Sequence, residues 1–137
     1  MIRRLALATA ALGLLAGPAV LADEPKDATK GEAELAKMIE GRIAGEPASC
    51  INTFGSRSLT QIDGTALVYR SGDTIWVNYT RTPDAIDEDE ILVIRKFSGS
   101  QLCRSDQITL RDRFSYIFSG FLILDDFVPY RLPEGEG

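Results

Sequence analysis

The chain has 137 residues, of which 45% are hydrophobic and 26% charged, with 15 basic and 20 acidic side chains and a formal charge of -5. This composition is typical of one globular domain, and it excludes a collagen-like repeat, a low-complexity linker and a membrane protein with several spans. The sequence contains no histidine. A Ser-His or Cys-His nucleophile pair, and any metal site that needs imidazole, are therefore excluded as well.

The first 22 residues have the pattern of a secretory signal peptide: two arginines, an apolar run over residues 5–17, and small residues before a polar segment. We expect cleavage after Ala22 and a periplasmic or secreted protein without stable membrane insertion; an uncleaved anchor is the alternative. Cleavage removes Arg3 and Arg4, which leaves 13 basic and 20 acidic side chains, a net charge of -7. A chain this acidic is not expected to bind nucleic acid or anionic lipid headgroups.

Residues 23–47 are expected to form a polar segment and an amphipathic helix. Thr29-Lys30-Gly31-Glu32 has the form of a capping box, which predicts that the helix begins at Thr29. Gly45 and Pro47 predict its end. The helix would carry one apolar stripe that packs on a sheet, formed by Leu35, Met38, Ile39 and Ile43.

Residues 48–131 carry short β-rich runs separated by turn residues, and 132–137 form a polar tail that we expect to be disordered. The turn Ser71-Gly72-Asp73 predicts a hairpin between 67–70 and 74–79. Other strands are expected at 91–94 and 108–111, and by alternation at Phe114, Tyr116 and Phe118. Gly120 indicates either one bulged strand or two strands about a bend.

These elements predict an α+β or mainly β fold. We expect the N-terminal helix to pack on a curved antiparallel sheet that forms a sandwich or a small barrel. Cys50 and Cys103 are an even number of cysteines in an exported chain, which favours a disulfide between them over a metal site or a nucleophile.

Three short motifs then resemble a family of short exported bacterial proteins classed as a domain of unknown function. They are Ser49-Cys50-Ile51, the segment Leu102-Cys103-Arg104-Ser105-Asp106-Gln107-Ile108 followed by Asp112, and Asp126-Phe127-Val128-Pro129-Tyr130. The resemblance covers residues 48–131. It implies a glycine where this chain has Ser105, and two further cysteines, within 80–89 and near Leu122, that this chain lacks. If those two pair with each other, the bridge predicted here is unaffected. The resemblance implies no activity.

Five carboxylates lie close together between two predicted strands, at Asp84, Asp87, Glu88, Asp89 and Glu90. Such a run suggests a calcium-binding site, but it lacks the ligand alternation and the central glycine of a calcium-binding loop. We expect a solvated loop and no metal. Four other acidic residues next to apolar strands could serve a carboxylate-dependent hydrolase, namely Asp106, Asp112, Asp125 and Asp126. We expect no catalytic residues and no cofactor, and we interpret Asp106 as a turn or cap residue.

Trp76 is the most informative aromatic residue, because strand alternation places it opposite Ile75 and Val77. It either lies under the N-terminal helix or forms part of a contact surface with Leu67 and Tyr69. The predicted function is a non-catalytic periplasmic binding or interaction module whose partner is a protein or small ligand of the cell envelope. A structural envelope component and, after it, a hydrolase are the alternatives. An interaction module requires an exposed aromatic patch on a sheet face.

Overall fold

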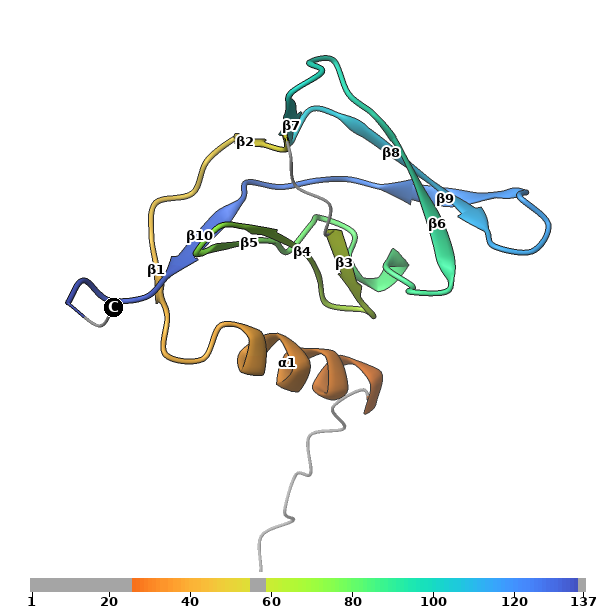
Figure 1. Ribbon diagram of the computed structural model, residues 1–137. Helices are drawn as coiled ribbons and strands as arrows, with labels where there is room; N and C mark the ends of the chain where they lie inside the picture. Colours follow the sequence, from red (N-terminus) through yellow and green to blue (C-terminus); the bar gives the residue numbers. More distant parts are fainter. Residues whose placement is uncertain (1–25, 55–58, 136–137) are drawn as a thin grey trace, which may run out of the picture.

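The computed structural model describes residues 26–54 and 59–135, so the predicted signal peptide and its cleavage after Ala22 lie outside the described residues. The described residues form one α-helix, α1 (Lys26–Met38), a short 3-10 helix, η1 (Pro83–Ala85), and antiparallel strands in three sheets (Figure 1). The described helix is too short and too polar to cross a membrane.

The central layer is a five-stranded sheet in the order β1-β10-β5-β4-β3. Its strands are β1 (Ile43–Ala44), β10 (Val128–Arg131), β5 (Thr74–Asn78), β4 (Ala66–Ser71) and β3 (Leu59–Ile62). β4 and β5 form the predicted hairpin, in which Ser71 pairs with Thr74. Gly72 in the turn has a φ of 57°, a conformation that glycine adopts at little steric cost. This hairpin prediction is confirmed.

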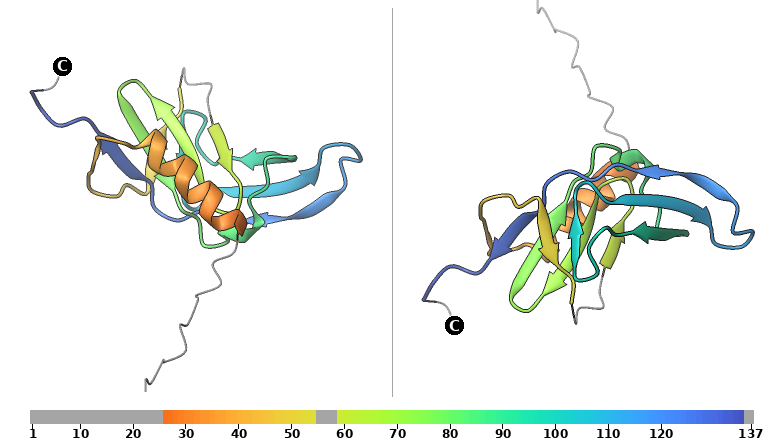
Figure 2. Two further views of the ribbon diagram at one scale, coloured as in Figure 1. Left: turned by 90° about the horizontal axis from the view of Figure 1, so that it is seen from below. Right: turned by 90° about the horizontal axis from the view of Figure 1, so that it is seen from above.

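Helix α1 lies across one face of this sheet (Figure 2, left). Leu35, Met38 and Ile39 pack against a cluster on the sheet that includes Ile75 and Val77. Two details of the helix prediction are wrong. The helix begins at Lys26, so Thr29 lies within it, and Ile43 belongs to β1, where it is 61% exposed.

The reason for the early end of the helix is Gly41 rather than Gly45. Gly41 has a φ of 74°, and the amide of Arg42 donates to the carbonyl of Ile39. A glycine in this left-handed conformation ends a helix and redirects the chain. The chain therefore leaves the helical path before it reaches Ile43.

The opposite face of the five-stranded sheet is covered by two smaller sheets (Figure 1). One pairs β2 (Cys50–Asn52) with β7 (Gln101–Cys103). The other has the order β6-β8-β9, formed by β6 (Glu90–Arg95), β8 (Gln107–Asp112) and β9 (Phe118–Leu122). The core between the layers includes Leu67, Leu102, Ile108 and Leu110. The fold class is confirmed, and the sheets of the described residues do not close into a barrel.

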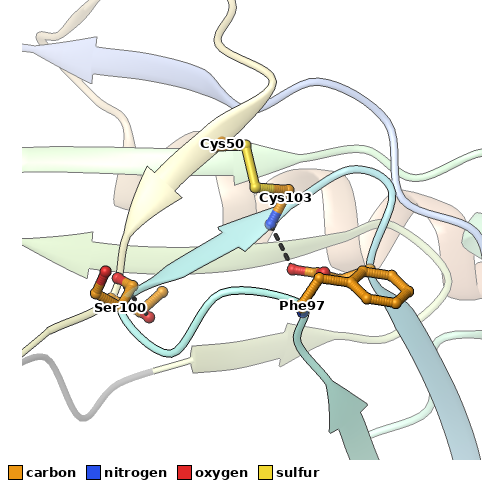
Figure 3. The surroundings of a disulfide bond; sticks show 6 residues. Cys50, Phe97, Ser100 and Cys103 are labelled. Atoms are coloured by element: carbon orange, nitrogen blue, oxygen red, sulfur yellow. Dashed lines mark hydrogen bonds between the residues drawn. A yellow bond between two sulfur atoms is a disulfide. The ribbon is translucent and has the colours of Figure 1, made fainter.

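The predicted disulfide is confirmed: Cys50 and Cys103 are directly opposite each other on β2 and β7, and their sulfurs are bonded (Figure 3). Asp106 holds the turn that follows. One of its carboxylate oxygens accepts the amide of Cys103 at 2.7 Å, and the other accepts the amide of Phe97 at 3.1 Å. Asp106 is buried, and its interpretation as a turn residue is confirmed.

Candidate functional site

The predicted contact surface does not exist as an exposed surface. Leu67 and Tyr69 are 2% and 5% exposed and belong to the core between the two sheet layers. Trp76 is partly buried and packs against the same core. The prediction is wrong because the β6-β8-β9 and β2-β7 sheets fold back over this face of the hairpin.

The alternative position for Trp76 is wrong as well. Helix α1 covers the opposite face, which carries Ile75 and Val77. The alternation of side chains along β5 was interpreted correctly, but both faces of the strand are covered. Neither face of this hairpin is therefore open to a partner.

The exposed aromatic side chains lie on another sheet. The strands β6, β8 and β9 turn one set of alternating apolar residues, which includes Leu92, Ile108 and Leu122, toward the core. The residues that alternate with these form a surface that we call the outer face. It consists of Ile91, Val93, Arg95, Gln107, Thr109, Arg111, Phe118 and Phe121 on the strands, and of Ile123, which directly follows β9 between the buried residues Leu122 and Leu124. Its large apolar members Val93, Phe118, Phe121 and Ile123 are exposed.

A bulge in β9 brings two phenylalanines together on the outer face. Gly120 pairs with Leu110, whereas Arg111 pairs with Phe118, so Ser119 is an extra residue without a partner on β8. The bulge turns Phe118 to the same side as Phe121. Their rings are 4.9 Å apart in an edge-to-face arrangement. The strand around Gly120 is thus one bulged strand, as one of the two predicted alternatives required.

The turn between β8 and β9 projects beyond the rest of the described chain (Figure 2). This turn, which we call the tip, comprises residues 113–117. It was predicted as strand at Phe114 and Tyr116, and that prediction is wrong, since the chain reverses here. The tip exposes three large apolar side chains, Phe114, Tyr116 and Ile117.

Several hydrogen bonds order the tip. A single carboxylate oxygen of Asp112 accepts the amides of Phe114 and Ser115 and the hydroxyl of Ser115, at 2.7–3.0 Å. Bonds to the amide and hydroxyl of Ser115, followed by the bond to the amide of Phe114, lower the pKa of Asp112 below its ordinary value. The guanidinium of Arg111 donates to the carbonyl of Tyr116 at 2.9 Å.

Tyr116 has a φ of 58°, a left-handed conformation that bulky residues seldom adopt. Such a conformation costs on the order of 1 kcal/mol or more, and it persists only where the surroundings determine it. The hydrogen bonds to Asp112 and Arg111 are those surroundings. The tip therefore holds exposed aromatic side chains on an ordered backbone.

The acidic run borders a cleft of about 410 Å³ at the start of α1, together with Lys30, Glu34 and Asp63. Two of these carboxylates are used by the backbone: Asp63 accepts the amide of Glu88 at 2.6 Å, and Asp87 accepts the amide of Asp89 at 2.9 Å. In the part of the chain that the structure describes, no three Cys, Asp or Glu residues are grouped so that they could hold a metal ion. Asp63 and Asp87 thus help to order this loop.

The four acidic residues considered for hydrolysis lie in three segments: the turn after β7, the end of β8, and the chain before β10, which holds both Asp125 and Asp126. Asp106 holds the turn after β7, and Asp112 holds the tip. Asp126 forms an ion pair with Arg104 at 3.1 Å, and Asp125 accepts the amide of Asp126. Each carboxylate is engaged locally, and none of the four lines the acidic cleft.

The outer face has only a weak signal in the sequence, because it depends on pairing between strands. Val93, Thr109 and Phe121 are aligned across three strands, but this alignment depends on the pairing of segments 12 to 16 residues apart.

Comparison of the chain with protein families, with curated proteins and with solved structures gives no match. The candidate site therefore rests on the geometry of this chain alone.

Proposed function

We propose that this chain is a non-catalytic interaction module of the bacterial periplasm or of the secreted medium, and that its contact surface is the outer face and the tip. The proposal moves the contact surface away from Trp76. The observation that carries it is the group of seven exposed large apolar side chains on one small sheet and its turn: Val93, Phe114, Tyr116, Ile117, Phe118, Phe121 and Ile123.

Two physical arguments support the proposal. Contiguous exposed apolar surface is uncommon on a monomeric protein and marks contact sites, and aromatic side chains supply much of the binding energy at such sites. The backbone hydrogen bonds of the tip also fix these side chains before binding. A preordered surface loses less conformational entropy when it binds.

The location is supported by the disulfide and by the signal-peptide pattern. A structural disulfide persists in oxidising compartments such as the periplasm and the extracellular medium. Cys50 and Cys103 join two strands of three residues each. Strands this short form few ladder hydrogen bonds, so the disulfide stabilises their pairing.

Site-specific photocrosslinking tests the proposal. Benzoylphenylalanine replaces Phe121 in one variant and Phe97 in a matched control, because Phe97 is 75% exposed but lies outside the outer face, in the loop between β6 and β7. Illumination of intact cells that export the protein should give a defined adduct from position 121, identified by mass spectrometry, and no such adduct from position 97. No adduct from position 121, or identical adducts from both positions, would contradict the proposal.

A further inference from the structure

We infer that the outer face binds a protein segment that carries carboxylates on both sides of an apolar side chain. This inference rests on the proposed function and specifies the chemistry of the partner. It depends on the charges of the outer face and on their spacing.

The charges of the outer face are of one sign. Arg95 and Arg111 are its ionisable residues, and none of the outward-facing residues of β6, β8 and β9 is a carboxylate. Among the described residues the ion pair between Arg104 and Asp126 is the only salt bridge, so neither outer-face arginine is neutralised by one within the described residues. In a chain with 20 acidic and 15 basic residues, this face is locally basic and complements an acidic partner.

The spacing of the two arginines suits an extended chain. Arg111 shares a row of paired residues with Phe118, and Arg95 shares another with Gln107. Between them lies the row of Val93, Thr109 and Phe121. The two rows are four residues apart, about 13 Å along the strands. An extended segment with carboxylates at positions i and i+4 and an apolar residue at i+2 has the same spacing.

Arg111 is held in position for such a contact. Its guanidinium donates one hydrogen bond to the carbonyl of Tyr116, and a guanidinium has five N–H donors. The remaining donors suit a carboxylate, with which arginine forms strong, often bidentate hydrogen bonds. The contact with the tip thus reduces the cost of ordering this long side chain.

The acidic loop argues against an anionic membrane as the partner. Arg113 at the base of the tip donates to the carbonyls of Glu88 and Asp89, and Ser119 donates to the carboxylate of Glu90. The acidic loop therefore lies next to the tip. If the tip approached an anionic bilayer, the carboxylates of the loop and the lipid headgroups would repel each other. A protein segment bound to the outer face need not contact the loop.

A titration followed by NMR tests the inference, with the peptide Ser-Glu-Thr-Leu-Thr-Glu-Ser added to the isotope-labelled protein. The amide signals of Thr109, Arg111 and Phe121 should shift. The peptide with both Glu residues replaced by Gln should bind at least tenfold more weakly. Arg95→Gln and Arg111→Gln should each weaken binding of the acidic peptide about fivefold or more. The control is Lys37→Gln, at an exposed position of α1, which should leave binding of this peptide unchanged.

The outcomes separate this inference from the proposed function. Equal binding of both peptides, or shifts outside the outer face, would overturn the inference and leave the interaction module in place. Absence of binding at about 1 mM acidic peptide, a concentration at which even a weak complex would be detected, would also overturn it. So would cosedimentation with phosphatidylglycerol vesicles combined with no peptide binding, which would identify a membrane as the partner. The proposed function itself is tested by the photocrosslinking, and it fails if position 121 gives no adduct or gives the same adducts as position 97.

Discussion

The guanidinium carbon of Arg131 lies 5.6 Å from the centroid of the Trp76 ring. The two residues come from adjacent strands, β10 and β5, and Arg131 also donates from Nε to the hydroxyl of Thr74 at 3.2 Å. The indole thus has an arginine on its open side and the core on the other. Trp76 closes the end of the core between the layers, which is a structural role.

Trp76→Ala should therefore destabilise the protein. Removing a large, partly buried aromatic side chain costs about 2–3 kcal/mol, somewhat less than the loss of a fully buried one. Urea denaturation measures this cost. The interaction at the outer face should survive in the folded fraction of the variant. An unchanged unfolding midpoint together with a loss of binding would show that Trp76 belongs to the contact surface after all.

Removal of the disulfide should destabilise the domain strongly. The bond closes a loop with a sequence separation of 53 residues, for which the chain-entropy model gives about 4 kcal/mol. Cys50→Ala combined with Cys103→Ala should lower the free energy of unfolding by about 2–5 kcal/mol. The wild-type protein measured in reductant is the control, and it should unfold at the same urea concentration as the double variant. Equal midpoints for the oxidised and reduced wild type would contradict this prediction.

Asp106→Ala should cost about 2–4 kcal/mol, because it leaves two part-buried amides, those of Cys103 and Phe97, without their acceptor. Asp106→Asn keeps one acceptor oxygen and should cost roughly half as much. Asp126→Asn is the matched control: it removes a carboxylate from an exposed ion pair with Arg104, which is worth about 0–1 kcal/mol. Thermal unfolding ranks the three variants, and an Asp106→Ala variant as stable as Asp126→Asn would refute the role of the turn.

Acid should loosen the tip, but only at a pH below the ordinary pKa of an aspartate. The amide and hydroxyl of Ser115 and the amide of Phe114 lower the pKa of Asp112 in the folded protein. A lowered pKa means that the carboxylate stabilises the tip fully at neutral pH, and that this contribution is lost as the pH falls through the folded-state pKa. The amide signals of Phe114 and Ser115 should titrate below the ordinary pKa of an aspartate. In the control variant Asp112→Asn, these amide signals should not titrate in this pH range. If they titrate at the ordinary pKa of an aspartate in the wild-type protein, the hydrogen bonds from Phe114 and Ser115 to Asp112 do not form in solution.

The elements that the sequence predicted well are those determined by local chemistry. A glycine in a two-residue turn between β-rich runs predicts a hairpin, and two cysteines in an exported chain predict a bond. The helix was predicted in type but not in its limits, because Gly41 and Gly45 are equally plausible ends by composition. The helix also packs closely on the turn at Thr65, since a Cβ at Gly31 would clash with the hydroxyl of Thr65.

The contact surface was mispredicted because alternation defines two faces of a strand but not what covers each. On β5, Trp76 and Ile75 were assigned correctly to opposite faces, yet the sheet that covers Trp76 comes from residues 90 to 122. The regular spacing of Phe114, Tyr116 and Phe118 also resembles a strand. It is interrupted by the side chain of Asp112, whose hydrogen bonds to the following amides form a turn.

Ser119 is an extra residue in β9. The number of residues in this strand therefore determines, more than its composition does, which side chains the hairpin exposes to solvent. Because side chains alternate along a strand, one inserted residue reverses the orientation of everything between it and the end of the hairpin. Between Ser119 and the end of the hairpin lie Phe118 and the tip, whose large apolar side chains are exposed. On the other side of Ser119, Leu122 remains in the core. Loss of this one residue should therefore turn Phe118 away from the face that carries Phe121, while Leu122 stays in the core.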